Sequence, residues 1–203
     1  MADEIKKDAV AVDAPEEKTA ETAVLEEMAK AGLLFGRKRS RTNPRMKKYI
    51  YTTRNGFEII DLMQTIEKIE AAQKFLKEVV KTGRPILFAG TTPASSTVTK
   101  EVAERLNQPF VAERWLGGTL TNFETISKRL GYYMTLKADQ AAGRLDKYTK
   151  KERTAMEKEI TRLTRLFGGL ERLSALPAVV IVVGADSHEI ATREANRMKI
   201  PVI

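Results

Sequence analysis

The chain has 203 residues, of which 42% are hydrophobic and 31% are charged, and this suffices for one domain with a packed core. No apolar stretch reaches the roughly 18 residues that a membrane span needs, and no export signal is recognisable at the N-terminus. The sequence has no cysteine and one histidine. Disulfides, thiolate metal sites and histidine clusters are therefore excluded, and we expect neither a metal nor a cofactor.

The net charge of +8 is distributed unevenly along the chain. Residues 1–27 carry nine acidic residues and three lysines, a net of −6, whereas the remainder holds 32 basic and 18 acidic residues, a net of +14. A body this basic favours a polyanionic partner, usually nucleic acid, although such charge can also serve solubility alone. Residues 1–22 are rich in Ala, Glu, Lys and Asp, and we expect a disordered acidic tail there.

A short amphipathic helix is predicted over residues 22–32, and the densest basic stretch of the chain follows it. Between residues 37 and 54 there are eight basic side chains and no acid, with Tyr49 and Tyr51 among them. Because uncompensated like charges repel, a merely solvated surface explains this stretch poorly, and we predict a loop that contacts RNA phosphates and can stack on an unpaired base. The candidate RNA-binding residues are Arg37, Lys38, Arg39, Arg41, Arg45, Lys47, Lys48 and Arg54.

A β-hairpin is predicted over residues 49–60, because two strand-like runs flank the turn dipeptide Asn55-Gly56. A helix is expected from about residue 61 to residue 82. Its apolar face is predicted to carry Leu62, Ile66, Ile69, Leu76 and Val80. Residues 85–90 form a continuous apolar run, which is typical of a strand buried on both faces of a parallel sheet.

The next helix is expected to start at Thr92 and Pro93, and a strand over residues 110–113 completes a strand–helix–strand unit. The inward face of this helix is predicted to carry Val98, Val102 and Leu106. Residues 90–92 lie where parallel sheets often bind phosphate, but they match neither the dinucleotide-binding glycine motif nor the P-loop. Nucleotide binding is therefore the less favoured interpretation of this turn.

Residues 114–122 join this unit to a region of different composition. They include the single tryptophan, Trp115, for which we favour core packing over RNA contact. Over residues 121–174, two narrow apolar stripes at helical spacing, separated by a break at Gly143, predict an inserted antiparallel coiled-coil hairpin that projects as an arm, rather than two helices lying on the sheet. The stripes are Phe123, Ile126, Leu130, Tyr133 and Lys137, then Met156, Ile160, Leu163, Phe167 and Leu170. We expect glycines to permit close packing where the arm leaves and rejoins, and the candidate hinges are Gly117, Gly118, Gly168 and Gly169.

A further strand is predicted over residues 178–183, followed by a helix over residues 186–198. We expect a capping box of Asp186 and Glu189 at the start of this helix, with Ile190 and Met198 on its inward face. His188, in its first turn, is expected at a capping or surface position. Residues 201–203 begin another strand, so we expect a C-terminal piece to be missing.

Several of these segments are similar, in order and spacing, to motifs of the "S two" family of small-subunit ribosomal proteins. They span residues 24–203 and include Phe35-Gly36, Asn43-Pro44-Arg45-Met46-Lys47, Arg54-Asn55-Gly56, Arg114-Trp115-Leu116-Gly117-Gly118-Thr119-Leu120-Thr121-Asn122 and Glu194-Ala195-Asn196. The resemblance departs from the family where Leu34 and Arg37 replace frequent histidines and where Thr92 replaces a common basic residue.

The resemblance implies an α/β fold with a Rossmann-like parallel sheet flanked by helices over residues 23–120 and 175–203, and an inserted coiled-coil arm over residues 121–174. It also implies a structural constituent of the small ribosomal subunit in the cytoplasm, which supports translation and is not an enzyme. Small-subunit rRNA and neighbouring ribosomal proteins, in many bacteria including the mRNA-binding "S one" protein, are the implied partners. Arg114, in the signature motif, is a further candidate RNA contact.

Two other functions stay open at this point. An enzyme or nucleotide-binding module on a parallel sheet is one, although no carboxylate pair or nucleophile–base pair stands out. The other is an arm that docks another protein without RNA, for which binding would be insensitive to salt.

Overall fold

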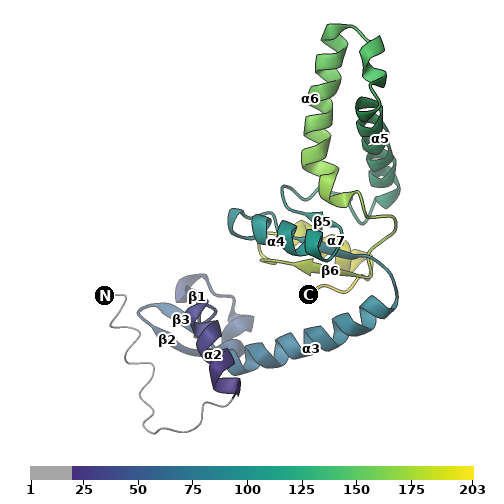
Figure 1. Ribbon diagram of the computed structural model, residues 1–203. Helices are drawn as coiled ribbons and strands as arrows, with labels where there is room; N and C mark the ends of the chain where they lie inside the picture. The colour runs from purple at the N-terminus through teal and green to yellow at the C-terminus, as the bar shows by residue number, and fades with distance from the viewer. Residues whose placement is uncertain (1–19) are drawn as a thin grey trace. The chain divides into compact units, whose positions relative to one another are not determined.

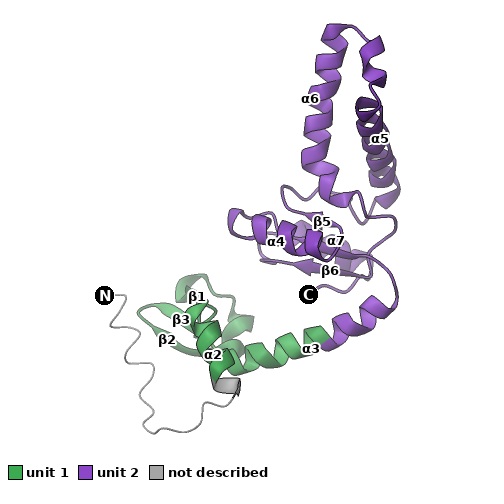
Figure 2. Ribbon diagram, viewed as in Figure 1, with its two compact units in different colours: residues 1–73 green, residues 74–203 purple. Residues whose placement is uncertain are grey.

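The computed structural model describes residues 20–203 and divides into two compact units, residues 1–73 and 74–203 (Figure 2). The tail predicted over residues 1–22 lies outside the described residues except for its last three, which belong to helix α2. This helix covers Ala20–Lys30 and is followed by Gly32 with φ of +82°. The predicted helix is therefore present and begins two residues early.

The first unit contains a three-stranded antiparallel sheet in the order β1-β3-β2 (Figure 1). Its strands are β1 Phe35–Lys38, β2 Ile50–Arg54 and β3 Phe57–Ile60. The predicted hairpin is confirmed, because Asn55 and Gly56 form a two-residue turn with φ of 50° and 76°, the left-handed values that such turns require.

The basic stretch is more structured than the predicted loop. Beyond β1 and β2 it contains two 3-10 helices, Arg39–Arg41 and Pro44–Tyr49. Strand β1 was not predicted from its short, charged sequence. It forms because Gly36 allows the chain to approach β3: a Cβ there would lie 2.9 Å from the carbonyl oxygen of Glu58.

Helix α3 covers Leu62–Lys81 and begins as predicted, since Asp61 Oδ1 accepts a hydrogen bond from the backbone N–H of Met63 at 3.0 Å. The predicted apolar face is partly wrong. Ile69 and Val80 are 43% and 61% exposed, whereas Val79 is buried in a cluster with residues of the parallel sheet.

The second unit is built on a parallel sheet in the order β5-β4-β6, flanked by helices (Figure 1). Its strands are β4 Ile86–Ala89, β5 Phe110–Val111 and β6 Val179–Val182, and its flanking helices are α4 Pro93–Arg105 and α7 Glu189–Arg197. Alternate residues of β4 enter two different core clusters: Leu87 and Ala89 enter one, and Ile86 and Phe88 enter the other. The predicted parallel sheet, with strands buried on both faces, is thus confirmed.

Residues 201–203 continue this sheet beside β6, as predicted. Val202 forms a parallel bridge with Val180, and Val180 donates its backbone N–H to the carbonyl oxygen of Pro201 at 3.0 Å.

The predicted inward faces of α4 and α7 are wrong. The apolar residues expected to face inward are exposed, namely Val98, Val102, Leu106, Ile190 and Met198. The residues that are buried on these helices are Ser95, Thr99, Ala103, Ala191, Glu194 and Ala195. Apart from Glu194, these side chains are small, and on α4 small side chains are needed because the helix approaches the sheet closely. At Gly90, for example, a Cβ would lie 2.1 Å from Oγ1 of Thr99.

Helix α7 also begins later than predicted. Its first residue is Glu189, and its N-cap is His188, whose side chain makes no capping hydrogen bond. The predicted capping box of Asp186 and Glu189 is therefore not formed.

Two helices between β5 and β6 lie side by side (Figure 1). They are α5 Phe123–Ala141 and α6 Lys150–Phe167, joined through a 3-10 turn at Arg144–Lys147 that Gly143 precedes with φ of 68°. Helix α6 starts with a complete capping box of Thr149 and Glu152. The predicted stripes are confirmed in large part. Buried residues of both helices share a core cluster with the sheet, namely Ile126, Leu130, Tyr133, Leu163 and Phe167. Among residues 20–203, no helix is long and apolar enough to cross a membrane.

Candidate nucleic-acid interface

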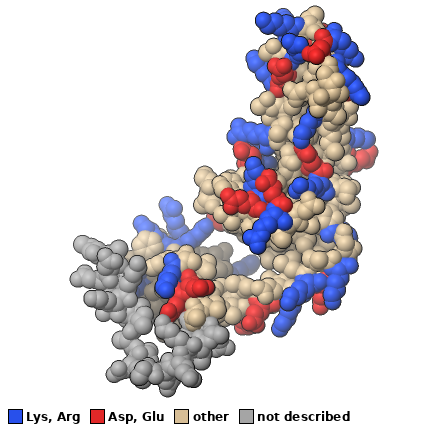
Figure 3. All heavy atoms as spheres, viewed as in Figure 1, with Lys and Arg blue, Asp and Glu red and all other residues tan. Residues whose placement is uncertain are grey.

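All eight basic residues of the stretch from residue 37 to residue 54 are exposed. Figure 3 shows the Lys and Arg side chains at the surface of the described chain. Strand pairing brings some of the eight together: Phe57 of β3 pairs with Lys38 of β1 on one side and with Arg54 of β2 on the other. Paired residues share one face of a sheet, so two cations flank one aromatic ring. The Nζ of Lys38 lies 5.7 Å from the centroid of that ring.

The second 3-10 helix positions three further cations. Asn43 caps it by accepting the backbone N–H of Arg45 at 3.0 Å, and Pro44 occupies its first position. Lys47 and Lys48 follow in its last turn, and the Nζ of Lys48 lies 4.8 Å from the ring centroid of Tyr49.

Aromatic rings accompany the cations, as the sequence predicted, but the exposed rings are not all the predicted ones. Tyr51 is 78% exposed, whereas Tyr49 is half-buried. Phe35 and Phe57, for which the sequence predicted no role, are also exposed. Rings at a basic surface can stack on unpaired bases.

A buried carboxylate anchors the basic stretch, and sequence reasoning missed it. Glu58 on β3 is 7% exposed, and its carboxylate accepts a hydrogen bond from the hydroxyl of Thr42, which lies between the two 3-10 helices. The contact fixes the connection that carries Arg41 and Arg45. The sequence signal that could have indicated this role is that Glu58 is the one acidic residue of an otherwise apolar strand.

In the second unit, Glu194 of α7 organises the signature stretch, residues 114–122. Its carboxylate accepts hydrogen bonds from several groups there: the backbone N–H groups of Gly118 (2.8 Å), Leu120 (3.0 Å) and Thr121 (3.2 Å), the Thr121 hydroxyl (3.3 Å) and the Trp115 indole N–H (3.2 Å). Burial by itself raises the pKa of Glu194, but these hydrogen bonds outweigh it and hold the pKa below its usual value. A buried, ionised carboxylate therefore fixes the loop.

This arrangement places the candidate residues of the signature stretch. Trp115 is half-buried and packs against the core cluster, which agrees with the predicted core position. Arg114 is exposed. Glu194 belongs to one of the family-like motifs, but the sequence indicated no role for it, because its hydrogen-bond partners in the signature stretch lie 73 to 79 residues away along the chain.

The four candidate hinge glycines differ in what surrounds them. Gly118 has φ of +90°, which favours glycine, and a Cβ at Gly169 would lie 2.3 Å from the carbonyl oxygen of Phe110. A Cβ at Gly117 would meet nothing within 4 Å, and at Gly168 the nearest atom is 3.7 Å away. Close packing is thus present at Gly169 and absent at Gly117, where it was also expected.

His188 is the N-cap residue of α7, which agrees with the predicted capping position, but it is buried, at 3% exposure, so the surface alternative is wrong. Its Nδ1 donates to the carbonyl oxygen of Gly184 at 2.8 Å, and its Nε2 accepts the backbone N–H of Thr91 at 2.8 Å. The imidazole ring therefore already accepts a hydrogen bond from a backbone N–H group in the turn after β4. In a nucleotide-binding sheet, N–H groups of this turn would bind a phosphate. Among residues 20–203, no group of three or more His, Asp or Glu side chains is placed to hold a metal.

Comparison with known proteins identifies the family. The family model for ribosomal protein S2 matches residues 28–203, which is most of the chain. The chain belongs to the ribosomal protein S2 family. It is similar to the protein named small ribosomal subunit protein uS2 from Roseiflexus castenholzii, with 40% identity over 176 residues that cover 87% of this chain and 67% of the relative. The protein of the same name from Dehalococcoides mccartyi is 40% identical over 182 residues, which cover 90% of this chain and 74% of the relative.

Membership confirms the resemblance drawn from the motifs. The ribosomal protein S2 family consists of structural, non-enzymatic proteins of the translation machinery, so the chain has a structural role in the cytoplasmic ribosome and is not an enzyme.

Proposed function

We propose that this chain is a structural constituent of the small ribosomal subunit, and that it binds small-subunit rRNA through the basic stretch of residues 37–54. The observation that carries the proposal is eight exposed cations on one short segment of a member of the ribosomal protein S2 family. Two relatives carry the small ribosomal subunit in their names. The proposed RNA-binding residues are Arg37, Lys38, Arg39, Arg41, Arg45, Lys47, Lys48 and Arg54, with Arg114 as a contact from the second unit.

The geometry supports phosphate binding in particular. The cations are held on strands β1 and β2 and on two 3-10 helices, so less backbone freedom is lost on binding than for an unstructured loop. Each phosphate that they neutralise releases counterions, which makes binding strongly dependent on salt. Phe57 between Lys38 and Arg54 offers a stacking surface beside two phosphate-binding groups.

We also propose that residues 121–174 form an inserted coiled-coil arm on a Rossmann-like α/β domain of residues 23–120 and 175–203. The side-by-side packing of α5 and α6 and the parallel order β5-β4-β6 support this organisation. The hinges of the arm are proposed at Gly117, Gly118, Gly168 and Gly169. Neighbouring ribosomal proteins, including the mRNA-binding "S one" protein, are proposed partners on the family resemblance.

The test is a triple charge reversal, Arg39→Glu, Arg41→Glu and Lys47→Glu, expressed in cells alongside the unchanged chain. We expect the variant to be depleted from the small-subunit peak of a sucrose gradient. The matched control is Lys74→Glu, Lys77→Glu and Lys81→Glu on α3, which makes an equal charge change at exposed positions outside the basic stretch. Equal occupancy of the subunit by both variants would refute the proposed RNA contact.

A further inference from the structure

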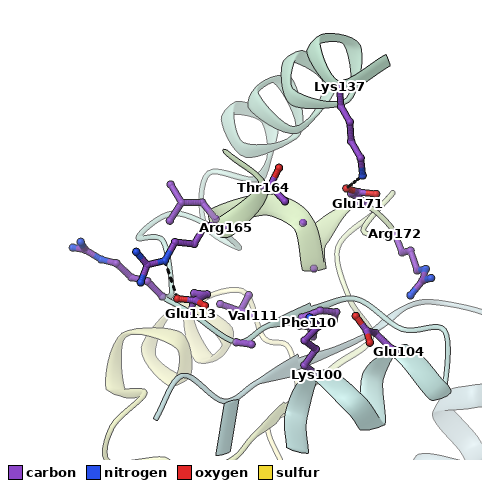
Figure 4. Close-up of a pocket in the computed structure, with 15 residues that line it drawn as sticks. Lys100, Glu104, Phe110, Val111, Glu113, Lys137, Thr164, Arg165, Glu171 and Arg172 are labelled. Carbon is purple, nitrogen blue, oxygen red and sulfur yellow. Dashed lines mark hydrogen bonds and ion pairs between the residues drawn. The ribbon is translucent and has the colours of Figure 1, made fainter. Parts of the chain in front are cut away.

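A cavity of about 590 Å³ lies at the root of the arm, entirely within the second unit (Figure 4). Its floor is formed by β5 and α4, and its walls are formed by α5, α6 and the 3-10 turn η4, Gly168–Leu170. We call this cavity the arm-root groove. Figure 4 shows side chains of both the arm and the sheet around it, including Lys137 and Arg165 on one side and Lys100 and Glu104 on the other.

The groove exists because the arm returns close to the edge of the parallel sheet. In the described sheet β5 is an edge strand of two residues. The backbone of Gly169 rests on it, so close to Phe110 that a Cβ would lie 2.3 Å from the Phe110 carbonyl oxygen. The arm is thereby fixed against the sheet at one point, and the side chains on either side of this point line an open recess.

Two of the three acids that line the groove are already engaged. Glu113 accepts a hydrogen bond from Nε of Arg165 on α6 at 2.9 Å. Glu171 accepts one from Nζ of Lys137 at 2.7 Å and one from the hydroxyl of Tyr133 at 2.9 Å. These pairs link the arm to its root and neutralise their own charges.

A surplus of positive charge remains in the groove. Lys100, Arg114 and Arg172 are exposed and form no salt bridge within residues 20–203, although Arg172 is near enough to Glu171 to help lower the pKa of that carboxyl, and Glu104 is the remaining acid of the lining. The three cations come from α4, from the segment after β5 and from the segment after η4. Three separate chain segments thus contribute exposed cationic side chains to the lining of one recess.

We propose that the arm-root groove binds a backbone phosphate of small-subunit rRNA through Lys100, Arg114 and Arg172. This inference rests on the proposed function and adds a second RNA site in a different compact unit from the basic stretch. A phosphate suits the groove because Arg and Lys are its ordinary protein ligands. An acidic protein segment suits it less well, because the cores of protein interfaces are depleted in Lys and Glu and enriched in apolar and aromatic side chains.

The test measures binding of the full chain to deproteinised small-subunit rRNA across a range of monovalent salt. The groove variant is Arg114→Glu with Arg172→Glu, both outside helices and strands. Its control is Lys74→Glu with Lys77→Glu, which makes the same charge change at exposed positions away from the groove. Thermal unfolding of both variants establishes that each is folded before binding is compared.

We expect the groove variant to bind at least about tenfold more weakly than the control. The slope of log affinity against log salt should fall by about 0.7–0.9, because the contact with one phosphate is lost. If the unchanged chain binds with a steep salt dependence and the groove variant matches the control, the groove inference is overturned while the proposed function stands. If the unchanged chain itself does not bind the rRNA, both the groove inference and the proposed function are overturned.

Reconstituted small subunits provide the second measurement. Normal rRNA binding by the groove variant, together with loss of a neighbouring protein from the subunit by mass spectrometry, would show that an acidic protein segment occupies the groove. That outcome also overturns the inference.

Discussion

The carboxylate of Glu194 accepts a hydrogen bond from the backbone N–H of Gly118 at 2.8 Å, across 76 positions of sequence. The same carboxylate binds the N–H of Leu120 at 3.0 Å. Helix α7 thus holds the segment that precedes α5, and the position of this segment depends on one buried side chain of α7. This relationship makes Glu194 a positioning residue for the segment that leads into α5.

The first prediction concerns the stability that Glu194 provides. In Glu194→Gln, one carboxylate oxygen becomes an amide donor facing backbone N–H donors, so at least one of them is left unsatisfied. We expect a loss of about 1–3 kcal/mol in the free energy of unfolding, measured by urea denaturation at pH 7. Glu189→Gln, on the same helix but at an exposed ion pair with Arg193, should lose less than about 1 kcal/mol. Equal losses would contradict the positioning role.

The second prediction concerns pH. The pKa of Glu194 lies below its usual value of 4.5, because hydrogen bonds to the carboxylate outweigh the effect of burial. A group whose pKa is lower in the folded state stabilises the fold above its unfolded pKa, and this contribution is lost as the pH falls through the folded pKa. The stability gap between the unchanged chain and Glu194→Gln should therefore be constant from pH 7 to about pH 5 and should shrink below it. Urea denaturation at each pH measures the gap, and one that persisted undiminished at pH 3 would show that ionisation of Glu194 is not its source.

The third prediction concerns the buried histidine. His188→Ala removes the acceptor of the Thr91 N–H and the donor to the Gly184 carbonyl. We expect a loss of about 1–3 kcal/mol in stability and faster amide hydrogen exchange at Thr91. Ser187→Ala, at the exposed neighbouring position, is the control and should leave exchange at Thr91 unchanged. Retained protection of Thr91 in His188→Ala would argue against the bridge.

The fourth prediction separates the two glycine pairs. Gly169→Ala places a methyl group 2.3 Å from the Phe110 carbonyl oxygen and should destabilise the chain by about 1–3 kcal/mol. Gly117→Ala meets no atom within 4 Å and should change stability by less than about 0.5 kcal/mol. Thermal unfolding of the two variants side by side is the measurement. A neutral Gly169→Ala would show that the turn Gly168–Leu170 can move away from β5 without loss of stability.

Local sequence determined much of this protein. The Asn55-Gly56 dipeptide predicts its hairpin because left-handed backbone is needed at both positions. The apolar run of residues 85–90 predicts a buried parallel strand, and the two apolar stripes within residues 121–174 predict the buried faces of α5 and α6. The signature stretch of residues 114–122 indicates the family by its residue order alone. Each of these signals is carried by residues near one another in the chain.

Tertiary structure alone decided the rest. Periodicity reports which residues are apolar, not how near the next layer lies, so Thr99 and Ala103 are buried on α4 while Val98 and Val102 are exposed. The role of Glu194 was likewise hidden, because a charged residue becomes a structural anchor only when distant N–H groups converge on it. How closely a helix approaches a sheet, and which buried polar groups find hydrogen-bond partners, depend on how the layers pack. No single stretch of this sequence determines either of them.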